Sequence, residues 1–374
     1  MPIQTRAAVI LEQPGEFTVT DVMLDDPRQG EILVKMAVSG LCHSDHHLET
    51  GDSTVTLPMV GGHEGTGVVE AVGPNTPGWD VGDRVVFSFI ASCGKCRWCN
   101  EGMTNLCDLG AFLLKGSRFT DPDSYRVSLL DGTPVAQMCG LGTFAEHTVV
   151  DVNSAVKLPA DAPLDKLWLL GCGVGTGWGS AVYAAGTRPG QAIVVMGVGG
   201  VGINAVQGAS HAGATAVIAV DPVALKREKA LAVGATHAFA TMAEATDFVR
   251  SITNGQGADA TIVTVGLASG KDVAEAFDSI RKAGTVVVTS IAPSSEDHIP
   301  VPILDLTRFQ KRIQGAIYGA SNPRADIPRQ YDMYRAGQLK LDELISGYYS
   351  LDDISQGYRD LLEGRNIRGG IKHT

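Results

Sequence analysis

The chain has 374 residues, of which 44% are hydrophobic and 19% charged, with a formal net charge of −11 at pH 7. This length allows two domains with separate cores. The acidic balance and the lack of any lysine or arginine run exclude a nucleic-acid surface, because phosphate binding needs clustered cations. No apolar segment approaches the roughly 20 residues of a membrane span, and residues 1–6 do not resemble a signal peptide. We therefore expect a cytoplasmic protein with no membrane association.

The first half reads as short strands separated by turn residues. Apolar or alternating segments predict strands at 7–11, 17–22, 32–38 and 67–72. Prolines and glycines interrupt the next stretch, at Pro74, Pro77, Gly78 and Gly82. The pattern predicts a β-rich barrel with functional loops.

Four cysteines follow, at Cys93, Cys96, Cys99 and Cys107. The two-residue gaps let consecutive thiolates point at one centre. Tetrahedral zinc takes four such sulfurs at about 2.3 Å, and a full shell is structural because no position stays open for chemistry. Disulfides or a redox C-x-x-C pair are the alternative, but the evenly spaced triplet and the expected reducing location favour zinc.

The pattern of apolar and polar residues changes near Gly171, and from Ile193 onward apolar strands alternate with amphipathic helices. Strands are expected at 193–196, 217–220, 261–265 and 285–289, and helices at 201–211, 224–233, 243–252 and 273–281. This alternation predicts a parallel doubly wound sheet. After about Tyr318 the pattern breaks into Pro- and Asp-rich segments, which we assign back to the first domain.

A glycine-rich motif follows the first strand of this strand–helix region. Met196 ends an expected strand and is followed by Gly197, Val198, Gly199, Gly200, Val201 and Gly202. In a dinucleotide-binding unit the first glycine allows a tight turn, the second lets the backbone approach the pyrophosphate, and the third lets the helix pack on the strand. The helix N-terminus then offers unpaired N–H groups to phosphate.

An acidic residue completes this motif. Asp221 ends the next expected strand, where a carboxylate accepts hydrogen bonds from the adenosine ribose and repels a 2′-phosphate. The motif therefore predicts NAD rather than NADP. Lys226, five residues on, is a second candidate for the ribose and reads equally well as a solvated helix residue.

Three residues far apart in sequence, Cys42, His63 and Cys172, each lie in a glycine-flanked loop after an apolar run. Separately, each reads as a buried thiol or an ordinary histidine. Together they supply the Cys₂His set that catalytic zinc uses in alcohol dehydrogenases, with a fourth position left for water or substrate.

Several motifs of the chain resemble those of a known enzyme family. The motifs C-H-S-D-H-H, G-G-H-E-G-T-G, C-G-K-C-R-W-C, G-C-G-V-G-T-G-W-G, G-V-G-G-V-G and G-R-N-I-R resemble those of zinc-dependent medium-chain alcohol dehydrogenases, over essentially the whole chain. The segments G-L-G-T-F-A-E-H-T-V-V and N-P-R-A-D-I-P-R are similar to the actinobacterial nitrosoaniline (NDMA)-dependent branch. The resemblance implies an α/β fold: a GroES-like β-rich catalytic domain from residues 1–175 and 319–374, and a Rossmann NAD-binding domain with a doubly wound parallel sheet from residues 176–318.

The resemblance also implies residue roles. Cys42, His63 and Cys172 would ligate catalytic zinc, with Asp45 orienting His63 and Glu64 nearby. Ser44 and His47 match the family's proton relay. The remaining matches are cofactor contacts and one wall of the substrate pocket: His43, Thr176, Arg368 and Phe89.

The expected function is reversible oxidation of primary alcohols to aldehydes, with hydride transfer to NAD and two zinc ions per chain. Members of the nitrosoaniline-dependent branch can hold the nicotinamide cofactor permanently. Oxidation of a formaldehyde–thiol adduct on the same scaffold and a non-catalytic nucleotide-binding homologue are the alternatives. The expected partners are a small alcohol or aldehyde and further copies of the chain, as a homodimer or homotetramer.

Overall fold

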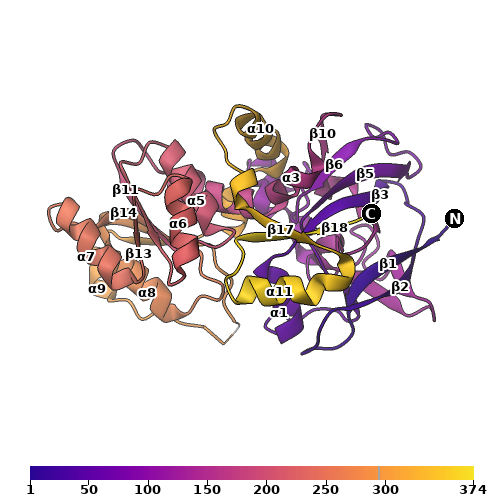
Figure 1. The fold of residues 1–374 in the computed structure, drawn as a ribbon, viewed down its shortest axis with the longest axis horizontal. Coiled ribbons are helices and arrows are strands. Elements are labelled where there is room, and N and C mark those ends of the chain that lie inside the picture. Colours follow the sequence, from indigo (N-terminus) through magenta and orange to yellow (C-terminus); the bar gives the residue numbers. More distant parts are fainter. Residues whose placement is uncertain (294) are drawn as a thin grey trace. The chain divides into compact units, whose positions relative to one another are not determined.

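The computed structural model describes residues 1–293 and 295–374, which form two compact units (Figure 1). The first unit contains residues 1–172, 322–333 and 345–374, and the second contains residues 173–321 and 334–344. The α/β fold class, with a β-rich part and a doubly wound part, is confirmed.

A closed barrel of five strands forms one half of the first unit, in the order β1, β2, β7, β8 and β4. Its strands are β1 (Ile3–Ile10), β2 (Thr18–Leu24), β4 (Met59–Val60), β7 (Val127–Leu129) and β8 (Pro134–Gln137). The apolar residues 7–10 of β1 are all fully buried, which explains why this run forms a central strand.

A second sheet completes this unit, in the order β10, β6, β5, β3, β18 and β17, with β9 also paired to β3. Its strands are β3 (Glu31–Gly40), β5 (Gly65–Val72), β6 (Arg84–Phe87), β9 (His147–Asp151), β10 (Ala155–Leu158), β17 (Ile345–Tyr349) and β18 (Arg368–Lys372). β18 runs antiparallel to β3, so the end of the chain joins a sheet begun by its first forty residues (Figure 1).

Short helices connect these strands. They are α1 (His43–Thr50), α2 (Arg97–Asn100), α3 (Leu164–Leu167), α10 (Pro323–Arg335) and α11 (Ile354–Leu362). Short 3-10 turns lie at Thr104–Leu106, Asp108–Phe112, Met138–Gly140, Val152–Ser154, Trp168–Gly171 and Leu351–Asp353.

The second unit is built on a six-stranded parallel sheet in the order β13, β12, β11, β14, β15 and β16. Its strands are β11 (Ala192–Met196), β12 (Ala216–Val220), β13 (His237–Phe239), β14 (Ala258–Val263), β15 (Ile280–Val288) and β16 (Arg312–Gly315). The chain order reverses between β11 and β14, and ligands of open α/β sheets bind at such a switch point.

The edge strands β13 and β16 were not predicted, because they are short and partly exposed and so lack the buried apolar run of the central strands.

The helices of this unit are α4 (Gly173–Gly179), α5 (Gly202–His211), α6 (Ala224–Ala232), α7 (Met242–Ile252), α8 (Gly270–Ser279) and α9 (Ile303–Arg308). A π-turn at Ser180–Ala184 and 3-10 turns at Ile317–Ala320 and Asp342–Leu344 complete the elements. Capping boxes start two of the helices, at Thr241 with Glu244 before α7 and at Ser269 with Asp272 before α8. Each box satisfies backbone N–H groups that a helix start leaves unpaired.

Residues 334–344 group with the second unit, whereas the sequence assigned them to the first domain. The cause is a pair of hydrogen bonds to α5: Lys340 N–H donates to Gln207 Oε1 at 2.8 Å, and Gln207 Nε2 donates to Lys340 O at 3.0 Å. Leu339, Leu341 and Leu344 are also buried. No helix among the described residues is both long and apolar enough to span a membrane.

Candidate metal centres and nucleotide site

The first unit brings together four side chains that are distant in sequence. Cys42, His63, Glu64 and Cys172 each offer a ligand atom, and all four atoms lie within 4.8 Å of one another. Cys42 immediately precedes α1, His63 and Glu64 lie between β4 and β5, and Cys172 follows the turn at Trp168–Gly171. The three expected ligands thus converge. Glu64, which the sequence placed only near them, offers a fourth ligand atom within the same distance.

Asp45 fixes the orientation of His63. The carboxylate is fully buried, and its Oδ1 accepts the backbone N–H of Gly62 at 2.9 Å and lies 3.0 Å from His63 Nδ1. Burial raises the pKa of Asp45, and burial also opposes protonation of His63, but the Asp45 charge raises the pKa of His63 overall. Because a carboxylate accepts from Nδ1–H, Nε2 is the nitrogen left to bind a metal.

Arg368 lies beneath the same cluster. Its guanidinium forms an ion pair with Glu64, and its centre lies 5.1 Å from the Trp168 ring. Arg368 is only 2% exposed and Glu64 is fully buried. The sequence suggested a cofactor phosphate as the partner of Arg368, whereas within the first unit the guanidinium is committed to Glu64 and, at 3.4 Å, to Leu41 O.

The donor set fits a zinc ion. Two thiols, one imidazole and a nearby carboxylate are ligands that zinc accepts. A hydrogen bond from Cys172 lowers the pKa of Cys42 well below its ordinary value, so one thiol ionises readily. Two buried carboxylate oxygens, Asp45 Oδ2 and Glu64 Oε1, have no hydrogen-bond partner among the described residues, which a nearby cation would compensate.

The second cluster consists of Cys93, Cys96, Cys99 and Cys107, whose sulfurs also lie within 4.8 Å of one another. Backbone N–H groups donate to the sulfurs: Cys93 to Cys107 at 3.3 Å, Cys96 to Cys93 at 3.3 Å and Cys99 to Cys96 at 3.5 Å. A backbone hydrogen bond from Asp108 lowers the pKa of Cys96 to about 6, whereas burial raises that of Cys107 to about 12. The four sulfurs are free thiols, not disulfides, and fit tetrahedral zinc.

The expected relay residues lie on α1. Ser44 Oγ is 3.7 Å from Cys42 Sγ, and the buried His47 places Nδ1 3.3 Å from Asp52 Oδ2. Asp52 was not singled out in the sequence. It reaches His47 because the chain reverses after α1 at Gly51, which has φ +81°.

The flanking residues have separate environments. Phe89 stands edge-on to the His63 ring, with centroids 5.8 Å apart, so it lies beside the cluster. His43 is the first residue of α1 and is partly buried.

The glycine motif of the second unit connects β11 to α5 at the switch point. Gly202 packs so tightly on the turn that a Cβ there would lie 1.9 Å from Gly197 O. At Gly199, by contrast, a Cβ would meet no described heavy atom within 4 Å, so the backbone is open to a ligand. Gly200 and Val201 lie between them, directly before the start of α5.

Asp221 lies at the end of β12, and backbone N–H groups fix its carboxylate. Val198 N–H donates to Oδ2 at 3.0 Å and Val223 N–H donates to Oδ1 at 2.9 Å. Arg227, which the sequence analysis missed, donates to Asp221 O at 2.7 Å. Lys226 on α6 is partly buried.

Thr176 on α4 is buried, and its Oγ1 has no hydrogen-bond partner among the described residues.

Comparisons with known proteins identify the family. Residues 28–160 match the alcohol dehydrogenase GroES-like domain, and residues 200–334 match the zinc-binding dehydrogenase family. The NDMA-dependent alcohol dehydrogenase of Amycolatopsis methanolica is 48% identical over 372 residues, covering 100% of both chains. The chain belongs to the zinc-binding alcohol dehydrogenase family. The resemblance inferred from the motifs, including that to the nitrosoaniline-dependent branch, is confirmed.

Other alcohol dehydrogenases match over the same length. The putative alcohol dehydrogenase D of Mycobacterium tuberculosis is 48% identical over 371 residues, covering 99% of this chain and 100% of the relative. Two solved structures cover 100% of both chains: an alcohol dehydrogenase zinc-binding domain protein from Burkholderia ambifaria, with a TM-score of 0.92 and 31% identity, and benzyl alcohol dehydrogenase from Acinetobacter calcoaceticus, with a TM-score of 0.91 and 29% identity.

The buried ion pair between Glu64 and Arg368 should contribute to stability. Replacing Arg368 by glutamine leaves the Glu64 carboxylate buried without its counter-charge, which typically costs about 3–5 kcal/mol. We expect R368Q to lower the free energy of unfolding in urea by roughly that amount. The matched control is R365Q, which removes a half-exposed arginine close to the same strand and should change stability little. Equal stabilities of the two variants would contradict the importance of the pair.

Proposed function

We propose that this alcohol dehydrogenase oxidises primary alcohols to aldehydes, reversibly, with zinc at the buried cluster and NAD at the glycine motif. The observation that carries the proposal is the convergence of Cys42, His63 and Cys172, from three separate loops, onto one buried point. Glu64, the fourth nearby group, is engaged in an ion pair with Arg368. Three protein ligands would then leave a position for substrate, whereas a purely structural zinc site needs four.

The residues of the two clusters would bind zinc and orient its ligands. Cys42, His63 and Cys172 hold the zinc, and Asp45 fixes the His63 ring through Nδ1. Zinc there would supply Lewis-acid polarisation of the alcohol oxygen. Glu64, held by Arg368, adds negative charge beside the ligand set. The second cluster, at Cys93, Cys96, Cys99 and Cys107, would hold a structural zinc.

A proton must leave the alcohol, and α1 carries the groups to move it. Ser44 lies beside the Cys42 sulfur and can accept the hydroxyl proton, and His47 lies one helical turn further on. Asp52 accepts a hydrogen bond from His47 Nδ1, which leaves Nε2 to exchange the proton. Histidine suits this step because an imidazole can both accept and donate a proton.

The nucleotide would be held by the second unit. The backbone at Gly199, Gly200 and Val201 would receive the pyrophosphate at the start of α5, and Asp221 the adenosine ribose. The nicotinamide would accept the hydride. Thr176 offers its buried, unpartnered hydroxyl. Arg368, which pairs with Glu64 through Nη2, keeps an Nε without a hydrogen-bond partner among the described residues, and it is proposed as a further contact together with His43 and Lys226.

Removing one ligand tests the metal assignment. We expect Cys172→Ala to stay folded, to lose turnover and to fall from two zinc ions per chain to one, measured by metal analysis and an alcohol-dependent assay. Cys139→Ala is the control, because Cys139 is also a buried thiol but lies outside both clusters. Full activity and zinc content in the Cys172 variant would mean that the third ligand is misassigned.

Replacing Asp221 tests the nucleotide preference. Without this carboxylate the 2′-phosphate of NADP is no longer repelled, so Asp221→Ser should raise kcat/KM for NADP relative to NAD by about 10–100-fold, the effect of roughly 1–3 kcal/mol. Asp247→Ser, which removes an exposed carboxylate on α7, should leave the ratio unchanged. The same ratio in both variants would count against the ribose role.

The relative named NDMA-dependent suggests that the nucleotide stays bound through turnover. In that case the purified, dialysed protein should keep a reduced-nicotinamide absorbance band after incubation with alcohol, and NDMA should act as electron acceptor without added NAD. A dialysed protein that lacks the band and turns over only with added NAD would instead have an exchangeable cofactor.

A further inference from the structure

The two residues that flank His63 in the sequence both bond to Thr143, which lies between β8 and β9. Thr143 N–H donates to Gly62 O at 3.0 Å, and Thr143 Oγ1 donates to Glu64 O at 2.9 Å. Thr143 and Glu64 are fully buried, so water does not compete for these bonds. The backbone on each side of the imidazole is therefore fixed by the same residue.

The close approach of Thr143 to this segment requires glycine at position 62. Gly62 has φ +88°, a backbone conformation that favours glycine, and a Cβ there would lie 2.4 Å from Thr143 Oγ1. Gly62 N–H donates to Asp45 Oδ1, the atom that also contacts His63 Nδ1. Asp45 thus orients the ring of His63, and Thr143 fixes the backbone that carries it.

Buried polar side chains fix Thr143 in turn. Ser39 Oγ donates to Thr143 O at 2.5 Å, and it lies 2.9 Å from His373 Nε2. Because the Ser39 hydroxyl has a single proton, the Nε2–H of His373 is the donor in the second contact. Ser39 is fully buried, and His373 is also buried. Thr143 is therefore anchored to β3 and, through Ser39, to the residue that follows β18.

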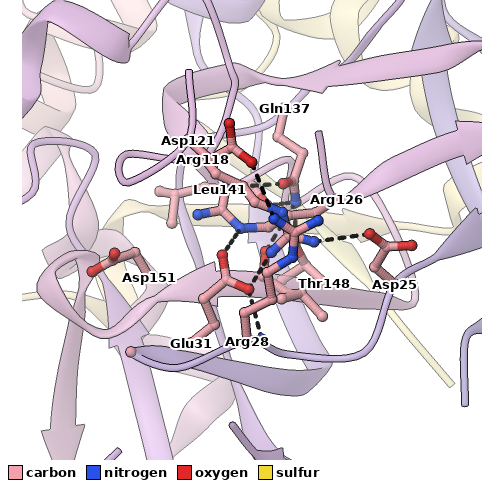
Figure 2. Close-up of polar contacts among 12 residues, drawn as sticks. Asp25, Arg28, Glu31, Arg118, Asp121, Arg126, Gln137, Leu141, Thr148 and Asp151 are labelled. Carbon is pink, nitrogen blue, oxygen red and sulfur yellow. Dashed lines mark hydrogen bonds and ion pairs between the residues drawn. The ribbon is translucent and has the colours of Figure 1, made fainter. Parts of the chain in front are cut away.

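A buried ionic cluster centred on Glu31 anchors the chain just before Thr143 (Figure 2). Glu31 Oε1 accepts a hydrogen bond from Arg126 Nε at 2.8 Å. Arg126 Nη1 donates to Gln137 Oε1 at 3.4 Å, and Gln137 Nε2 donates to Leu141 O at 3.1 Å. These four residues are all buried. The turn that leads into Thr143 is therefore fixed by a connected network of buried polar groups, which makes its position well defined.

We propose that Thr143 is a positioning residue for His63: its N–H and its hydroxyl fix residues 62–64 so that the imidazole meets the Cys42 and Cys172 sulfurs in one geometry. This inference rests on the proposed function, because it takes His63 as a zinc ligand. Thr143 acts through the backbone of its neighbours. Its loss should therefore weaken the binding of zinc at this cluster, since a ligand that is less well placed binds metal less tightly.

Three variants of the zinc-loaded enzyme test this role. Thr143→Val keeps the volume of the side chain and removes the bond to Glu64 O, whereas Thr143→Ser keeps the hydroxyl. Thr66→Val is the control, because the Thr66 hydroxyl is also fully buried and also donates to a backbone carbonyl, Leu164 O at 2.7 Å. That carbonyl belongs to α3 and not to the segment that carries His63.

Zinc affinity, measured in competition with a chelator, is the main readout. Thr143→Val should bind zinc at the His63 cluster about 10-fold more weakly, the low end of the usual range for such supporting residues, because Gly40 N–H still donates to Glu64 O at 3.1 Å. The four-cysteine cluster serves as the internal reference and should keep its affinity in every variant. With cobalt in place of zinc, the thiolate-to-metal absorbance should change in Thr143→Val and return to that of the wild type in Thr143→Ser.

The control separates positioning from stability. Thr66→Val should unfold at a lower urea concentration than the wild type, as Thr143→Val should, because each loses one buried hydrogen bond. Its zinc affinity and cobalt spectrum should stay those of the wild type. If Thr143→Val does not fold, Thr143→Ala and Thr66→Ala replace this pair with the same expectations.

Equal zinc affinities in the Thr143 and Thr66 variants would overturn the inference, because the Thr143 hydroxyl would then serve stability alone. A Thr143→Ser variant that binds zinc as weakly as Thr143→Val would also overturn it, since the hydroxyl would not be the group that matters. Both outcomes leave zinc binding and alcohol turnover by the wild type intact. A wild type that holds no zinc at the His63 cluster, or oxidises no alcohol, would instead refute the proposed function.

Discussion

The buried ion pair between Glu64 and Arg368 joins two parts of the chain that are 304 residues apart in sequence. Arg368 begins β18, and the antiparallel pairing of β18 with β3 brings it beneath the loop that carries Cys42. Without its partner, the Glu64 carboxylate would lie buried and uncompensated beside two thiols and an imidazole. The cluster of potential metal ligands, its surrounding hydrogen bonds and the closing strand of the sheet therefore depend on one another.

The two clusters that contain cysteine differ in how far apart their members lie in the sequence. Cys93, Cys96 and Cys99 are partly exposed, and their sulfurs accept backbone N–H groups of their own short loop. Cys42 and Cys172 come from distant segments and are surrounded by buried charges. A local cluster of four sulfurs can form within one loop, whereas the second cluster needs the whole unit to be folded.

Much of the fold and of the candidate sites was predictable because short sequence motifs indicate them. The regular spacing of the four cysteines, the strand–glycine–helix order before Asp221 and the glycine-flanked loops of Cys42, His63 and Cys172 each indicate a chemistry. Asp52 could have been suspected from its place directly after Gly51, since a glycine after a helix commonly reverses the chain. The hydrogen bond from Arg227 to Asp221 O, the Glu31 cluster and the pairing of Arg368 with Glu64 have no local signature. They arise from tertiary packing, as do the short edge strands β13 and β16.

The order of segments in the first unit has a consequence for biosynthesis. Residues 173–321 form most of the second unit as one continuous stretch, so this unit needs only eleven later residues, 334–344, to be complete. The first unit starts to emerge from the ribosome earlier, yet β17 and β18 are among its last residues to be made. Until then residues 38–40 of β3 lack the strand that pairs with them, although β9 already pairs with residues 31–35. An unpaired strand edge invites wrong associations. The part of the molecule that is translated first is thus completed last.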